Sequence, residues 1–99
     1  MFNNDHYITS GAAATIPLEA ATAMWIAIEL MPDPKDYLQV FELKPLTECV
    51  QHIIHTQEQP EYCVNMYIPL LMPDCQPVTE KVYVIDDGDH STMLLAEEY

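Results

Sequence analysis

The sequence predicts an α+β fold in which one main helix packs on an antiparallel sheet of four to five strands. Three observations lead to this prediction: an apolar stretch lies between two prolines at helix-length spacing, several segments after it are rich in β-branched and aromatic residues, and the links between those segments are short. Short links favour antiparallel pairing, because parallel neighbours need crossovers of a dozen residues or more. At 99 residues the chain fits a single domain, residues 1–99.

The main helix is predicted over residues 17–31. Pro17 stands where a first-turn proline is favoured, strong helix formers follow it, and Pro32 ends the pattern. Its few polar residues fall on one narrow stripe, and apolar ones such as Met24 and Trp25 cover most of the circumference. We therefore expect this helix to be buried on more than one side, by a sheet and by either loops or a partner chain.

The strands are predicted from runs of β-branched and aromatic residues and from period-two alternation. The final residues, 91–99, are open to two interpretations: Ser91 caps a short helix, which we prefer, or "DDGD" turns a hairpin into a last strand. A short strand at 7–9 is a further option. The predicted strands are 37–43, 49–57, 62–68 and 81–85.

The charge balance restricts the function. The chain has 16 acidic residues against three lysines and no arginine, which gives a formal net charge of −13. Such a surface repels phosphates, so direct nucleic-acid binding and docking on an anionic membrane are not expected. A basic partner is favoured, because long-range attraction speeds the encounter. The alternative is that the acids only confer solubility.

The cysteines and the N-terminus indicate the compartment. Cys49, Cys63 and Cys75 are widely spaced and form no C-x-x-C pair, which fits a reducing environment. "MFNNDHY" has neither the basic nor the apolar segment of a signal peptide, and no apolar run has the length of a membrane span. We expect a cytoplasmic protein without membrane contact.

Two stretches contain candidate metal ligands. Asp86–His90, "DDGDH", does not match the ligand spacing of an EF-hand loop, and Asp-Gly is a common turn dipeptide, so a charged turn is favoured over a metal site. Cys49, His52 and His55 stand at intervals of three, but on a strand His52 would point away from the other two. We expect no metal and no cofactor at either stretch.

Signals for catalysis are weak elsewhere. The two glycines form no phosphate-binding loop, no serine lies in a nucleophile-elbow motif, and the absence of arginine removes the usual clamp for anionic substrates. We therefore expect a protein that is not an enzyme. The positive signal is a C-terminal concentration of carboxylates with tyrosines among them, since tyrosine is enriched at interfaces. The predicted partner-binding residues are Asp86, Asp87, Asp89, Glu97 and Glu98, with Tyr83 and Tyr99 as flanking contacts.

Several stretches resemble a known family: "MFNND" with "YIT", then "MW", "DYLQVFEL", "QEQPEY" and "EKVYVIDDGDHSTMLLAEEY". Together they are similar to a small bacterial family designated domain of unknown function 960. The resemblance implies a small protein of Gram-positive bacteria, staphylococci among them, found in mobile elements and phage-related regions. It assigns no activity. Neighbouring acidic families in such elements include DNA-mimicking inhibitors of uracil-DNA glycosylase, and no motif here matches those inhibitors.

The leading hypothesis is a non-catalytic acidic binding protein, a DNA-mimic type of inhibitor that occupies the basic cleft of a DNA-processing or defence enzyme. A second hypothesis is a homodimeric scaffold that associates through the helix around Met24 and Trp25, with an acidic surface that only confers solubility. A third is a small metal-dependent enzyme that uses the Asp86–His90 loop.

Overall fold

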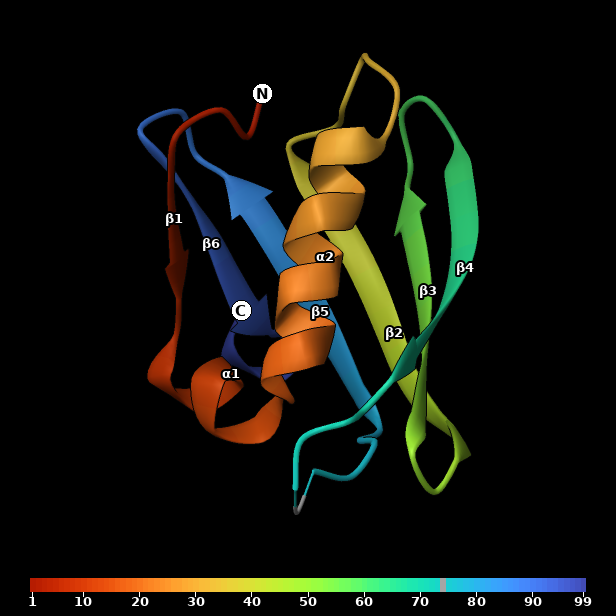
Figure 1. The fold of residues 1–99 in the computed structure, drawn as a ribbon. Coiled ribbons are helices and arrows are strands. Elements are labelled where there is room, and N and C mark those ends of the chain that lie inside the picture. The colour runs from red at the N-terminus through yellow and green to blue at the C-terminus, as the bar shows by residue number, and fades with distance from the viewer. Residues whose placement is uncertain (74) are drawn as a thin grey trace.

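The structure, a computed structural model, describes residues 1–73 and 75–99. Within these residues, two α-helices and a 3₁₀-helix accompany six strands; both α-helices lie between the first and second strands, and the 3₁₀-helix follows the last strand (Figure 1). The elements are β1 (Asp5–Ile8), α1 (Ser10–Thr15), α2 (Leu18–Leu30), β2 (Leu38–Thr47), β3 (Val50–Gln57), β4 (Tyr62–Pro69), β5 (Glu80–Asp86), β6 (His90–Leu95) and η1 (Ala96–Glu98).

The strands form one mixed sheet in the order β1-β6-β5-β2-β3-β4. Neighbours are antiparallel except β1 and β6, which run parallel with Asp5 opposite His90 and Ile8 opposite Met93. The first strand therefore pairs with the last. Because this pairing joins the two ends of the chain, the N-terminal segment extends the sheet beyond β6.

The predicted fold, one main helix on an antiparallel sheet of four to five strands, is wrong. The sheet has six strands and is mixed, and a second α-helix lies before α2. The preferred helix at the C-terminus is also wrong, because His90–Leu95 is a strand and only Ala96–Glu98 is helical. The parallel β1–β6 pair leaves no local pattern in the sequence, since its partners are more than 80 residues apart.

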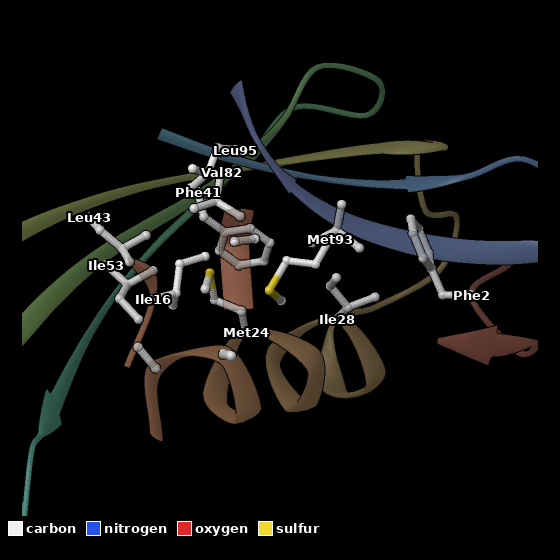
Figure 2. Close-up of a cluster of buried hydrophobic side chains, with 14 residues drawn as sticks. Phe2, Ile16, Met24, Ile28, Phe41, Leu43, Ile53, Val82, Met93 and Leu95 are labelled. Atoms are coloured by element: carbon white, nitrogen blue, oxygen red, sulfur yellow. The ribbon is translucent and has the colours of Figure 1, made fainter. Parts of the chain in front are cut away.

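Helix α2 crosses one face of the sheet, and the hydrophobic core lies between them (Figures 1 and 2). Met24 and Ile28 point from the helix toward the sheet, where they meet Phe41 and Met93. Side chains alternate along a strand, so the buried residues of β2, β3, β5 and β6 stand at every second position, on the face toward α2. In β2, Gln39, Phe41 and Leu43 are buried, while their neighbours are exposed or half-buried.

The opposite face of the sheet carries neither of the two α-helices, and we call it the open face. It is less polar than one expects of a solvated antiparallel sheet, and its central side chains are half-buried by one another. Lys44 and Lys81 also belong to it by register. Its apolar and aromatic residues are Tyr7, Leu38, Val40, Ile54, Tyr67, Tyr83, Ile85 and Leu94.

The two ends of the chain are joined at α1. The Thr9 hydroxyl accepts a hydrogen bond from Ala12 N–H (3.1 Å), which caps α1, and donates one to Glu98 Oε1 (2.7 Å). The Glu98 carboxylate approaches Gly11 so closely that a Cβ there would lie 2.7 Å from Oε2. Glycine at position 11 therefore leaves room for the Glu98 carboxylate beside α1.

Shortening Met24 tests the core contact of α2. Met24 is fully buried, whereas Leu30 on the same helix is 79% exposed. We expect Met24→Ala to lower the free energy of unfolding by about 2–5 kcal/mol, because it leaves a cavity, and Leu30→Ala to change it by less than about 0.5 kcal/mol. Urea denaturation measures both, and equal effects would contradict the placement of α2.

Candidate functional site

Acidic residues from five separate segments meet at one end of the sheet. β1, β2, β4 and β6 begin at this end, and α2, β3 and β5 finish there, so their connecting loops lie together at the top of Figure 1. We call this region the acidic end. Its residues are Asp5, Glu29, Asp33, Asp36, Glu58, Glu61, Asp86, Asp87 and Asp89.

The stretch Asp86–His90 forms the hairpin between β5 and β6. Asp87 Oδ1 accepts hydrogen bonds from the N–H groups of Asp89 (3.3 Å) and His90 (3.1 Å), and Asp86 Oδ1 accepts one from Gly88 (2.8 Å). Gly88 has φ +103°, a conformation that L side chains rarely adopt. Two of the three aspartates in this hairpin therefore build the turn itself.

Asp86 also fastens the N-terminal segment to the sheet. Its Oδ2 accepts a hydrogen bond from Phe2 N–H (2.6 Å), and its Oδ1 accepts one from Asn4 Nδ2 (3.0 Å). Partial burial raises the pKa of the Asp86 carboxyl, but the hydrogen bonds from Phe2, Gly88 and Asn4 together lower it below its ordinary value. The carboxylate is thus held ionised and is fully engaged within the fold.

A buried polar network holds the other two loops of the acidic end. Gln57 Oε1 accepts hydrogen bonds from Asp36 N–H (2.9 Å) and from Gln39 Nε2 (2.7 Å), and Gln57 Nε2 donates to the carbonyl of Pro60 (2.9 Å). Asp36 Oδ2 in turn accepts one from Gln59 N–H (3.2 Å). The loop after α2 and the β3–β4 hairpin are therefore tied together under their charged residues.

His55 completes this network as a neutral imidazole. Since Gln39 donates through Nε2 to Gln57 and to the Asp36 carbonyl, its Oε1 faces His55 Nε2 at 2.7 Å and accepts a hydrogen bond from the Nε2–H group. His55 is 1% exposed and stacks on Phe41 with ring centroids 4.3 Å apart. Burial lowers the pKa of His55 from 6.5 to about 4.

Five carboxylates of the acidic end remain available to a partner. Asp5, Glu29, Glu58, Glu61 and Asp89 are exposed, and their carboxylates make no hydrogen bond or ion pair with any described residue. Asp33 lies 3.9 Å from Lys35, and Asp87 lies 3.1 Å from the His90 imidazole. Few of the negative charges at the acidic end are therefore neutralised by other residues of the chain.

A shallow cleft of about 440 Å³ opens beside the acidic end on the open face of the sheet. Three acidic residues line it, Asp36, Glu42 and Glu58, together with Tyr37 and Lys81. Tyr37 is exposed. The cleft has the size and charge to accept a basic side chain, with an aromatic ring available for a cation–π contact.

The predicted partner-binding residues do not form one surface. Asp86, Asp87 and Asp89 lie at the acidic end, but Glu97, Glu98 and Tyr99 follow β6 at the opposite end of the sheet (Figure 1). Glu98 accepts hydrogen bonds from Thr9 Oγ1 and Leu95 N–H and so has a structural role. Tyr83 and Tyr99 contact each other edge to face at 5.4 Å.

The remaining members of the acidic end were not among the predicted site residues. They are Asp5, Glu29, Asp33, Asp36, Glu58 and Glu61. The sequence did hold a signal for most of them, because "MPDPKD" and "QEQPEY" are turns with acids beside proline. Alternate connections of an antiparallel sheet lie at the same end, so the two turns and the "DDGD" hairpin could have been grouped.

The candidate metal ligands are dispersed in the fold. His52 is on the open face, where it contacts Asn65 Oδ1 (2.8 Å), while His55 faces α2 and Cys49 is exposed in the β2–β3 turn. No group of three or more His, Cys, Asp or Glu residues that could hold a metal ion occurs among residues 1–73 and 75–99.

The helix residues proposed for a dimer contact are engaged within the chain. Met24 is buried in the core, and Trp25 is half-buried and stacks on His6 with centroids 4.1 Å apart. In addition, the part of the chain that the structure describes contains no helix long and apolar enough to cross a membrane.

The family described as "Staphylococcal protein of unknown function (DUF960)" matches residues 5–98. The chain belongs to this family. The resemblance noted in the sequence is thereby confirmed, and it now extends over all six strands. No curated protein matches the chain.

A solved structure shares the fold of this DUF960 chain. It is titled "Crystal structure of the protein of unknown function from Enterococcus faecalis", with a TM-score of 0.75 and 23% sequence identity over 98% of this chain and 92% of the other. At that identity the likeness establishes a common fold and says nothing of activity.

Acid should destabilise the protein through His55. In the unfolded chain His55 becomes protonated near pH 6.5, whereas in the folded chain its pKa is about 4. The free energy of unfolding therefore falls as the pH decreases through this window. We expect a loss of about 2 kcal/mol between about pH 7 and about pH 5. Urea denaturation of the His55→Gln variant should show a clearly smaller loss, and an unchanged pH dependence would contradict the assignment.

Neutralising Asp86 should loosen the N-terminal segment. Asp86→Asn removes the charge that accepts the hydrogen bonds from Phe2 and Asn4, so amide hydrogen exchange over residues 2–8 should accelerate. Asp89→Asn in the same hairpin is the matched control, and it should leave that exchange unchanged. Equal exchange in the two variants would show that Asp86 does not fasten this segment.

Proposed function

We propose that this protein is a non-catalytic acidic binding protein of the DNA-mimic type, whose acidic end enters the basic, DNA-binding cleft of a partner protein. The observation that supports the proposal is the convergence of carboxylates from five segments on one end of the sheet; five of these carboxylates are exposed and unpaired within the described structure. The net charge of −13 adds long-range attraction toward a basic partner.

The arrangement suits recognition because the charged loops are rigidly held. The network of Gln39, Gln57 and Asp36 joins two of the loops, and Asp86 fastens the N-terminus to the third. Charged loops that are already ordered before binding lose little conformational entropy when they contact a partner. The cleft lined by Asp36, Glu42 and Glu58 offers a place for an arginine or lysine of that partner.

The placement of the acids also costs stability, which supports a functional reason for it. Glu29 lies in the last turn of α2, whose C-terminal end disfavours negative charge, and no basic residue lies there. Like charges in neighbouring loops repel one another as well. A requirement for solubility alone would be met by carboxylates spread over the whole surface.

Salt and charge-neutralising variants test this function. The immobilised protein should capture a DNA-binding protein from a bacterial lysate at about 0.05 M salt and lose it at about 0.5 M salt, because screening weakens exposed charge pairs. Duplex DNA should displace the captured protein, as mimicry requires competition for one cleft. Capture that is insensitive to salt or to DNA would contradict the proposal.

Two matched double variants locate the contact. Glu58→Gln with Glu61→Gln removes two exposed charges from the acidic end, and Glu48→Gln with Glu97→Gln removes two exposed charges from the opposite end. The first pair should weaken partner binding by at least about tenfold. The second should have a much smaller effect, and the reverse order would place the contact at the C-terminal turn.

A further inference from the structure

The edge strand β4 lacks the features that normally protect an edge. Tyr62–Pro69 is eight residues long, contains no charged residue, and pairs with β3 without a register shift. Its only proline is the last residue. Natural proteins usually block such edges with charges, internal prolines or bulges, because unpaired main-chain groups bind other strands. The other edge strand, β1, has four residues and includes Asp5.

The register shows which main-chain groups of β4 point outward. Leu70 N–H donates to the carbonyl of Cys49 (2.8 Å), so residues of even number in β4 face β3 in this alternating ladder. The N–H and C=O groups of Cys63, Asn65 and Tyr67 therefore point away from the sheet. No described residue lies beyond β4 in the strand order.

We propose that β4 pairs in antiparallel fashion with β4 of a second copy of this chain, about a two-fold axis at Asn65. This register places Cys63 of one copy opposite Tyr67 of the other, and all three outward-facing residues of each strand are paired. Moving the axis to Val64 leaves Tyr67 opposite Glu61, beyond the strand, and moving it to Met66 uses Pro69, which has no N–H.

Side chains on both sides of the seam agree with this register. Toward α2, Val64, which is 38% exposed, lies opposite Met66 of the other copy, and the pair would bury apolar surface. On the open face, His52 contacts Asn65 and stacks on Tyr67 at 4.9 Å. These two side chains are thus held in place before the strands meet.

The absence of charged residues on β4 lets a second copy approach this edge in spite of the repulsion between two acidic chains. Two chains of net charge −13 repel each other, so they can associate only where no acids face one another. In the proposed register Glu61 lies opposite Pro69 of the other copy, and the rest of the strand is uncharged. A basic partner would find no carboxylate to contact along this strand. When two identical strands pair in antiparallel fashion, the outward-facing main-chain N–H groups of each copy meet the outward-facing C=O groups of the other.

Sedimentation equilibrium of the full chain over a concentration series measures the association. We expect a monomer–dimer equilibrium that strengthens as salt rises from about 0.05 M to about 0.5 M, because screening reduces repulsion between the copies. This dependence is opposite to that of the proposed partner binding, so either idea can fail without the other. A chain that stays monomeric at both salt concentrations would overturn the dimer.

Lysine substitution at the two sheet edges identifies the surface. Tyr67 in β4 and Tyr7 in β1 both lie on the open face and are each 55% exposed. Tyr67→Lys should raise the dimer dissociation constant at least about tenfold, since it introduces a charge into the seam, and Tyr7→Lys should leave it nearly unchanged. Equal effects of the two variants would show that β4 is not the contact.

A single cysteine tests the register. In a background of Cys49→Ser, Cys63→Ser and Cys75→Ser, the Asn65→Cys variant should form a disulfide-linked dimer with oxidised glutathione. Residues directly opposite in a hydrogen-bonded antiparallel pair have Cα atoms about 5.5 Å apart, within disulfide range. Thr56→Cys in the same background is the control on β3 and should remain uncrosslinked. Failure of the Asn65→Cys variant to crosslink would overturn the two-fold at Asn65.

Discussion

One long helix has to cover one face of a six-stranded sheet, and this constraint shapes the rest of the molecule. Six strands span roughly 25 Å or more across the sheet, whereas a helix with its side chains is about 10–12 Å wide. α2 therefore protects the apolar centre around Phe41 and Met93, and the flanks need other cover. Phe2 and Ile16 supply part of it from the N-terminal segment and from the link between the helices.

The buried hydrogen-bond network of Gln39, His55 and Gln57 is a second consequence of the limited area that α2 covers. Where α2 ends, the sheet face continues as Gln39, His55 and Gln57 in place of apolar residues. Their hydrogen bonds reach the main chain of Asp36 and Pro60, so a buried network positions two exposed acidic loops. Core and surface are thus linked: the groups that fill the flank of the core also fix the charges that a partner would meet.

Electrostatics divides the surface into regions with different uses. The acidic end is almost uncompensated and suits a basic partner, while the β4 edge is uncharged and suits a second copy of the same chain. Lys44 and Lys81, two of the three lysines, belong to the open face by register. The open face therefore repels negatively charged groups less than the acidic end does. The most negative electrostatic potential lies at the loops where α2, β3 and β5 end.

The sequence by itself determined α2, the four strands from β2 to β5, and the charge. Pro17 and Pro32 bracket α2, alternation marks β4, and the acidic composition needs no coordinates. Only the tertiary structure decided that β1 pairs with β6, that Asp86 and Glu98 are occupied within the fold, and that acids from distant turns meet at one end. Local patterns report which face of an element is buried, whereas strand order depends on contacts between distant residues that no window of the sequence contains.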